Sequence, residues 1–508
     1  MGDVLKNALR SRCWLKYAIA LATPLILMLL LLAVCQGNLF NFTPLWSDEL
    51  GYWHETNTAV NRGLFSNNSG YFSYLEIPTN LLFYGAHGIF IIIPYYLIGI
   101  VLGWTTYTPL IANIIFMTAA MLLFARITRN TRHTAILAVL LLFFNYFLMY
   151  YITAMSETLH YACCIVIIAL VSRCFTDTSH KKRYMILLFI AVTIASFIRI
   201  SNVVFYLPMM LMVKLTKKHR YLYLILGWFV LTALLYYIYS RFAAPYPFGF
   251  LSDMLSVVRT GDLYGALSMV WDHFVTNIEL FFSPKDNVLL VFVRYASVLV
   301  LILSGFFSFF TIKHGRVSKR ENVDCVCLSS FFILLFTVML NLLLYDICDW
   351  RDTRAIAPVL FVSILLLATH AGANAALKAS VVTLAVISMF GFSQIFANAE
   401  NRFNGNNPSD YSLIHAIKYD PDASSRWGNT ILFNGFPPGS LNLDPGLGYS
   451  LVLFNDTESF KAKTQGGIKS RYVISYGALS DERLELMAEE NGCFLYLNLT
   501  SENKKGPS

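Results

Sequence analysis

Long apolar runs dominate the chain, and short polar segments that hold most of the charges separate them. A run of about 20 apolar residues can cross a bilayer as a helix, whereas a membrane β-barrel shows short alternating segments. The pattern therefore predicts an α-helical polytopic membrane protein. The expected spans, about eleven in all, are residues 17–36, 107–125, 134–150, 158–172, 184–198, 201–213, 221–240, 287–312, 325–345, 355–370 and 379–396.

Basic residues decide the role of one further apolar stretch, residues 88–103. Lys and Arg are enriched in cytoplasmic loops. If 88–103 crossed the membrane, the loop 126–133, which holds three arginines, would fall outside with every later basic loop. If 88–103 lies on the membrane surface, all the basic clusters fall inside. We therefore predict a juxtamembrane helix here, a cytoplasmic N-terminus and an outer C-terminus.

The composition changes at about residue 397, where Asn-, Asp- and Gly-rich turns separate short apolar runs. Such runs are typical of strands. The expected strands are NTILFNG, YSLVLFN, RYVISY and CFLYLNL, and DERLELMAEE (481–490) is expected to be a helix. We predict a membrane domain, residues 1–396, and a small soluble α/β domain, residues 397–508, on the outer face. The membrane domain would present the outer loops 37–106, 241–286 and 346–354.

The composition agrees with a membrane protein. Hydrophobic residues make up 56% of the chain, charged residues 13%, and the mean hydropathy is +0.57. The net charge of +8 comes from basic clusters between spans, which topology explains, so nucleic acid is not an expected partner. Cys348 and Cys493 are both predicted outside, but no sequence feature fixes the geometry that a disulfide between them requires.

The stretch TPLWSDELGYWHE, residues 43–55, places adjacent carboxylates just after the first span. Ser47 is a good helix N-cap, which would put Asp48 and Glu49 in the first turn, where the helix dipole favours acids. Asp48, Tyr52 and Glu55 would share one helix face. A carboxylate at a membrane surface among aromatic residues suits general-base chemistry or a divalent cation. Helix capping and catalysis are thus both open interpretations.

This arrangement resembles the GT-C superfamily of membrane glycosyltransferases, whose members carry an acidic motif in the first outer loop, followed by juxtamembrane helices. The resemblance extends to HGIFIIIPYYLIGIVLG (87–103), ELFFSPKDNVLLVFV (279–293) and DWRDTRAIAPVLF (349–361). Asn287 stands where the family usually has glycine. Within the superfamily the chain is similar to the bacterial glucosyltransferases that change the serotype of lipopolysaccharide O-antigen. The resemblance implies a GT-C-like fold.

The resemblance also implies a reaction, the transfer of a sugar from a polyprenyl-phosphate carrier to an outer-face acceptor. Asp48 would be the base, and Glu49 would assist it or bind a metal. Arginine pairs well with phosphate oxygens. The candidates for the donor phosphate are Arg351, Arg354, Arg199 and Lys285, and those for acceptor or sugar are Tyr52, Glu55 and Glu157.

Each candidate also has an ordinary structural explanation. Arg351 and Arg354 lie near acidic residues and would form surface ion pairs, and a helix start at Ser156 accounts for Glu157. His54 and His87 are amphipathic side chains at an interface, or metal ligands beside the acidic pair. A divalent cation is an option, and no other cofactor is expected.

The expected partners are the lipid-linked sugar donor, a glycan or lipid-linked acceptor and the lipid bilayer, and the expected location is the bacterial inner membrane. Two other functions fit a polytopic chain. A transporter or flippase of lipid-linked glycans should carry ionisable groups near the middle of its spans, but the candidate groups here gather at one face. An O-antigen polymerase or ligase would also act on the outer face, but an acidic pair after the first span is not expected of it.

Overall fold

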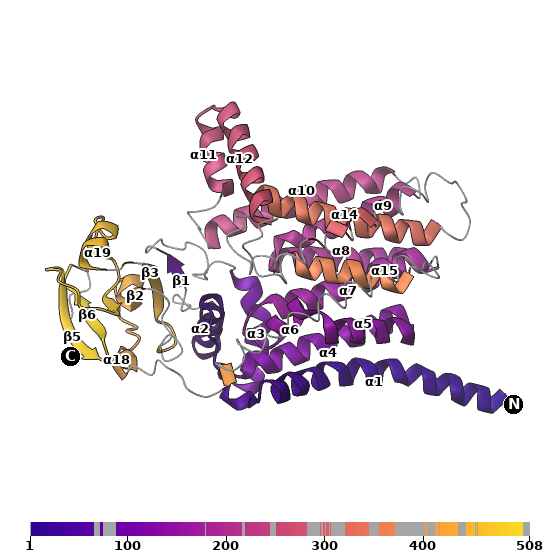
Figure 1. The fold of residues 1–508 in the computed structure, drawn as a ribbon, viewed down its shortest axis with the longest axis horizontal. Coiled ribbons are helices and arrows are strands. Elements are labelled where there is room, and N and C mark those ends of the chain that lie inside the picture. Colours follow the sequence, from indigo (N-terminus) through magenta and orange to yellow (C-terminus); the bar gives the residue numbers. More distant parts are fainter. Residues whose placement is uncertain are drawn as a thin grey trace.

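A computed structural model gives the arrangement of the chain (Figure 1). The residues that it describes are 2–65, 72–74, 88–177, 179–215, 219–243, 250–281, 295, 298–299, 301–303, 305, 321–344, 354, 356–370, 402–403, 412–415, 417–434, 443–452, 454 and 456–500.

Most of the described chain is helical, and the long helices run side by side in one bundle (Figure 1). The helices of this part are α1 (Gly2–Val34), η1 (Leu39–Asn41), α2 (Ser47–Arg62), α3 (Ile89–Leu102), α4 (Thr108–Thr128), α5 (Thr131–Phe143), α6 (Asn145–Tyr151), α7 (Glu157–Thr176), α8 (Lys181–Ile198), η2 (Ile200–Phe205), α9 (Tyr206–Leu215), α10 (His219–Ala243), α11 (Phe250–Arg259), α12 (Leu263–Phe281), α14 (Glu321–Leu344) and α15 (Ala357–His370).

Length and composition qualify four described helices as membrane spans. They are Trp14–Val34, Thr108–Thr128, Glu157–Thr176 and Arg220–Tyr239. The other predicted spans that fall on described residues are helical too, but they are broken, shorter or more charged. The predicted spans 287–312 and 379–396 lie mostly outside the described residues. The predicted fold class, a helical membrane protein with a small C-terminal α/β part, is confirmed, while the number of spans and their orientation stay predictions.

The predicted single span 134–150 is wrong in one respect, because the helix breaks after Phe143 and α6 continues at an angle of 74° to α5. Phe144 is extended at the break, and its ring packs 5.2 Å from that of Phe361. Beyond α6, Asn113 Nδ2 donates to the carbonyls of Tyr151 and Thr153. No proline or glycine lies at the break, so the sequence alone gives no sign of it.

The stretch 88–103 forms α3, a helix of 14 residues, as expected. Two tryptophans join its end to α2. Trp53 Nε1 donates to Thr105 O at 2.9 Å, and Trp104 Nε1 donates to Trp53 O at 3.0 Å. Figure 1 shows α2 and α3 at the end of the bundle that is nearer to the C-terminal sheet. The placement of α3 on the membrane surface stays a prediction.

The C-terminal part contains one six-stranded sheet with the order β1-β3-β2-β4-β6-β5. The first three pairings are parallel and the last two antiparallel. The elements are β1 (Phe72–Tyr74), α18 (Ser412–His415), η4 (Arg426–Asn429), β2 (Thr430–Asn434), β3 (Gly448–Val452), α19 (Thr457–Lys463), β4 (Tyr472–Ser475), β5 (Leu484–Glu490) and β6 (Cys493–Asn498). All four predicted strands are present. The strand β1, from the predicted outer loop 37–106, extends the sheet at its edge.

Strand alternation gives this sheet two apolar faces. Ile431 and Phe433 pack with Leu413 and Ile414 of the α18 segment, whereas Leu432 points to the other face and packs with Phe460 of α19. Figure 1 shows α19 beside the sheet. Cys493 is a buried free thiol, and Cys348 lies outside the described residues.

The helix predicted for 481–490 is wrong, because Leu484–Glu490 forms strand β5, antiparallel to β6. The segment is rich in helix-forming Leu, Glu, Met and Ala, which favoured the helical interpretation. The turn that follows this segment favours a strand instead. Asn491 and Gly492 have φ values of +50° and +77°, which is the two-residue turn of a tight hairpin. Pairing with the buried strand β6 therefore overrides the local propensity.

Gly492→Ala should weaken this hairpin, because a Cβ is strained at φ +77°. We expect a loss of about 1 kcal/mol, and hence about fivefold faster local opening of β5 and β6. Hydrogen–deuterium exchange of these strands in the solubilised full chain measures the effect. Gly477→Ala is the matched control, because nothing lies within 4 Å of a Cβ there and no positive φ is present. Equal exchange in the two variants would contradict the turn.

Candidate active site

Four charged residues from four helix ends meet where the bundle approaches the sheet. Asp48 lies in the first turn of α2, and Glu157 is the first residue of α7. Arg199 follows the last residue of α8, and Arg354 precedes α15. The helix dipole stabilises acids at N-termini and cations at C-termini, and the first three residues obey this rule. The antiparallel packing of α7 and α8 brings opposite charges to the same end of the bundle.

These residues form a chain of ion pairs. Arg354 Nη1 donates to Asp48 Oδ2 at 2.9 Å, and its Nε lies 3.8 Å from Glu157 Oε1. Arg199 Nη2 donates to the same Glu157 oxygen at 2.9 Å. The Glu157 side chain is 1% exposed, whereas that of Asp48 is 33% exposed. Asp48 is therefore the accessible acid of the group and Glu157 the buried one.

Two further predicted residues of α2 lie beside these ion pairs. Tyr52 is buried, and burial, Asp48 and Glu157 together raise the pKa of its phenol well above the usual value. Glu55 is buried one turn further along. Tyr449 of β3 lies beside the same helix, because its hydroxyl oxygen would be 3.4 Å from a Cβ at Gly51. Burial and the charges of Glu55 and Asp48 raise the pKa of its phenol. The predicted face of Asp48, Tyr52 and Glu55 is thus present, and the C-terminal sheet closes over it.

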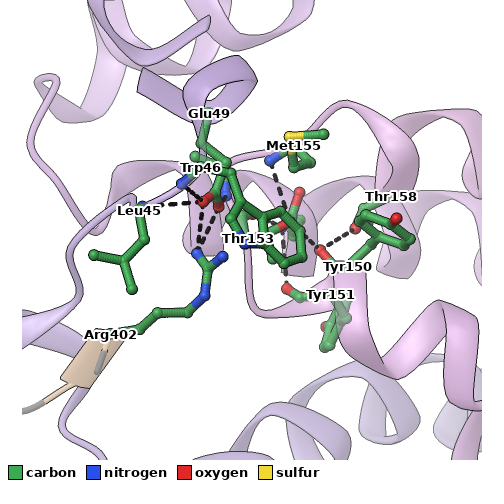
Figure 2. Close-up of polar contacts among 11 residues, drawn as sticks. Leu45, Trp46, Glu49, Tyr150, Tyr151, Thr153, Met155, Thr158 and Arg402 are labelled. Atoms are coloured by element: carbon green, nitrogen blue, oxygen red, sulfur yellow. Dashed lines mark hydrogen bonds and ion pairs between the residues drawn. The ribbon is translucent and has the colours of Figure 1, made fainter. Parts of the chain in front are cut away.

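Glu49, the neighbour of Asp48, points into the protein and is 0% exposed (Figure 2). Its Oε2 accepts hydrogen bonds from the backbone N–H groups of Leu45 and Trp46, and its Oε1 accepts one from Ala154 N–H. Arg402 Nη1 donates to both oxygens at 2.7 Å. Both oxygens of Glu49 are therefore occupied by protein donors.

Arg402 was not among the residues predicted from the sequence. It is 1% exposed, and its guanidinium lies 4.5 Å from the centre of the Trp46 ring. Its backbone carbonyl accepts a hydrogen bond from Thr43 N–H. One signal was available, because Arg402 follows shortly after the last predicted span on the outer side. An arginine at a membrane boundary calls for an acidic partner, and Glu49 is the acid at the corresponding end of the first span.

The later turns of α2 contact the loop before β3. His54 Nε2 lies 2.6 Å from Leu447 O, and Thr58 Oγ1 accepts from Gly446 N–H at 3.0 Å. Arg62 pairs with Asp444 at 3.6 Å, and its Nε donates to the carbonyl of Pro445. One helix therefore contacts the bundle through its first turn and the loop before β3 through its later turns.

The remaining candidates divide as follows. Arg351, Lys285 and His87 lie outside the described residues. His54 faces the loop before β3 and bonds to its backbone. Among the described residues, no three His, Cys, Asp or Glu side chains come together as a metal site. Asp48 and Glu157, the two acids of the cluster, share Arg354 as a counterion.

Comparison with known proteins gives no match to a family model and none to a curated protein sequence. Among solved structures, the chain is similar to ArnT from Cupriavidus metallidurans bound to undecaprenyl phosphate, with 12% identity over 97% of this chain and 99% of that one, at a TM-score of 0.48. The apo state of the same ArnT gives 12% identity over 93% and 96%, at 0.46. Archaeal oligosaccharyltransferase AglB from Archaeoglobus fulgidus, in complex with an inhibitory peptide and a dolichol-phosphate, gives 11% over 91% and 70%, at 0.49.

Arg402→Met should destabilise the protein strongly, because it leaves the Glu49 carboxylate buried without its counterion. Removing one partner of a buried pair typically costs about 3–5 kcal/mol. Thermal unfolding of the solubilised protein measures the loss, and Arg259→Met, at an exposed position of α11, should change stability by less than about 0.5 kcal/mol. The double variant Arg402→Met/Glu49→Gln should regain part of the loss. Simple addition of the two single effects would contradict the pairing.

The contact at His54 should weaken in acid. Burial lowers the pKa of His54 to about 4, although the bond to Leu447 and the charge of Asp444 oppose the shift. In an opened state, in which His54 has its usual pKa of about 6.5, the imidazole therefore takes up a proton at a pH at which it stays neutral in the folded state. The stability due to neutral His54 is complete above pH 6.5 and is lost as the pH falls toward 4.

Between pH 7.5 and pH 5 we expect a loss of about 2 kcal/mol from this group, seen as a fall in melting temperature. In His54→Gln the side-chain amide still donates to Leu447 O but does not titrate, so the difference between the two pH values should shrink. The same acid sensitivity in both proteins would assign it to other groups.

Proposed function

We propose that the chain is an integral membrane glycosyltransferase of the GT-C type. It moves a sugar from a polyprenyl-phosphate carrier to a hydroxyl of an acceptor on the outer face. The observation that carries the proposal is the cluster at the bundle end, where a partly exposed carboxylate, Asp48, lies in direct contact with a guanidinium, Arg354. A general base and a cation for the leaving phosphate are the two groups that such a transfer needs.

Exposure separates the roles of the two adjacent acids. A base must reach the acceptor hydroxyl, and only Asp48 is accessible, with its side chain 33% exposed. Glu49 is enclosed by five donated hydrogen bonds from three backbone N–H groups and Arg402. We therefore assign Asp48 the role of base and Glu49 that of a positioning residue, which fixes the first turn of α2.

Acidic side chains fix the positions of Arg354 and Arg199. Arg354 contacts both Asp48 and Glu157, and Arg199 contacts Glu157. A phosphate group offers more oxygens than one carboxylate and pairs well with a guanidinium fork. A bound donor would compete with Asp48 for Arg354. Such competition would free the Asp48 carboxylate as the donor arrives. Arg351 and Lys285 are further candidates for the same phosphate.

These groups account for the proton, the new bond and the leaving group of the transfer. Asp48 takes the proton of the acceptor hydroxyl, and the oxygen attacks the anomeric carbon of the sugar. The bond from that carbon to the phosphate oxygen breaks, and the phosphate keeps the electron pair. The cationic arginines stabilise the new negative charge, and Glu157 orients them. Tyr52 and Glu55, on the same helix face, would contact hydroxyls of the sugar or acceptor. One displacement of this kind inverts the anomeric centre.

The assignment of a substrate rests on the resemblance of residues 43–55 and their surroundings to the bacterial O-antigen glucosyltransferases. We propose a bacterial inner-membrane enzyme that acts on a surface polysaccharide such as O-antigen, with glucose as the sugar. The alternative of a lipid-linked glycan transporter is less well supported, because the paired charges gather at helix ends on one side of the bundle.

Asp48→Asn should abolish transfer, because the amide keeps the shape of the side chain but cannot take the proton. Loss of a general base typically lowers the rate by about 10²–10⁴. The assay is transfer of radiolabelled sugar from its polyprenyl-phosphate carrier in membranes that contain equal amounts of each protein. Asp422→Asn, at an exposed position of the C-terminal part, is the matched control and should keep full activity.

Transfer that persists in Asp48→Asn would limit Asp48 to capping a helix and holding Arg354, and would favour a polymerase, ligase or transporter. The melting temperature distinguishes a loss of catalysis from a loss of folded protein. Asp48→Asn should lower the melting temperature far less than Arg402→Met does.

A further inference from the structure

The helices α11 and α12 form a hairpin that projects from the side of the bundle (Figure 1). The sequence encodes the sharp turn between them. Gly261 has φ +85°, which ends α11, and Asp262 Oδ1 accepts from Gly265 N–H at 2.7 Å, which begins α12. The ring of His273 stacks on Phe250 at 3.8 Å and joins the two helices. The hairpin is thus a defined element.

The first half of α12 exposes large apolar side chains to an unusual degree. Leu263 is 65% exposed, Tyr264 84%, Leu267 70% and Trp271 65%. Their spacing places them on one face of the helix. Exposed aromatic and aliphatic residues that gather in this way mark a surface that another apolar phase covers.

The exposed polar residues of α12 occupy a different face. Ser268 and Asp272 are one turn apart and bonded to each other at 3.4 Å, and Thr276 and Glu279 continue the same side. The third face, with Ala266 and His273, packs on α11. The exposed surface is therefore amphipathic, which is typical of helices that lie at a membrane–water interface.

The direction of the hairpin agrees with such a position. In Figure 1 it runs across the direction of the bundle helices, at the level of α2 and α3. Its base is fixed, because Asn277 Nδ2 donates to Leu342 O near the end of α14. If the bundle helices cross the bilayer, the hairpin lies along the plane of the membrane.

We propose that the α11–α12 hairpin lies in the outer surface of the bilayer, with Tyr264, Leu267 and Trp271 inserted among the lipids. The preceding helix α10 is a candidate span of which only 11% is buried in the protein, so most of its surface is also free to face lipid. The hairpin carries Asp253, Asp262, Asp272 and Glu279 against Arg259. Apolar insertion therefore holds it, and attraction to anionic lipid does not.

Photo-crosslinking from single positions tests this in the full chain. p-Benzoylphenylalanine replaces Leu267 or Trp271, and the matched controls carry it at the neighbouring polar positions Ser268 or Asp272. All four positions are exposed, so the fold should tolerate each change. The proteins are irradiated in phosphatidylethanolamine–phosphatidylglycerol vesicles and in native membranes, and adducts are identified by mass spectrometry.

We expect adducts with the mass of one phospholipid at positions 267 and 271, at least about tenfold more abundant than at 268 and 272, in both membranes. Crosslinked dimers at 267 and 271 would show that a second copy covers the face. Crosslinks to another protein in native membranes would show a protein partner. Either result, or equal lipid labelling at all four positions, would overturn the proposal.

Discussion

The buried carboxylate of Glu49 is the constraint on which the end of the bundle near the sheet depends. It accepts hydrogen bonds from the segment before α2, from Ala154 in the turn before α7 and from Arg402 in the chain that leads to the C-terminal part. A carboxylate in such a place costs several kcal/mol unless all these donors are present. Three segments far apart in sequence are therefore fixed to one another by one side chain.

The same constraint places the proposed base. Adjacent residues of a helix differ in direction by about 100°, so the inward position of Glu49 turns Asp48 toward the partly exposed side. There it contacts Arg354, which also lies close to Glu157, and Glu157 in turn pairs with Arg199. An acidic pair after the first span thus has two functions in physical terms. One carboxylate holds the local structure, and its neighbour is left accessible beside a cation.

Much of this was predictable, because periodicity, charge bias and helix-end chemistry are local signals. The strand segments, the helix 88–103 and the location of Arg199, Arg354 and Glu157 at one end of the bundle followed from them, whereas the roles of these three residues stay proposals. The rest depends on distant partners. The break at Phe144 depends on aromatic packing, and β5 depends on its turn at Asn491 and on pairing with β6. Arg402 carries no motif, and only its buried partner reveals its importance.

The helix α2 finally links the two parts of the molecule. Its first turn belongs to the bundle through Glu49, and its later turns hold the loop before β3 through His54, Thr58 and Arg62. Tyr449 of that sheet lies against Gly51, midway between Asp48 and Glu55. The sheet is therefore held against the helix that carries the accessible acid. Among the described residues, direct packing of α2 on Tyr449 and on the loop before β3 therefore fixes the position of β3 relative to Asp48.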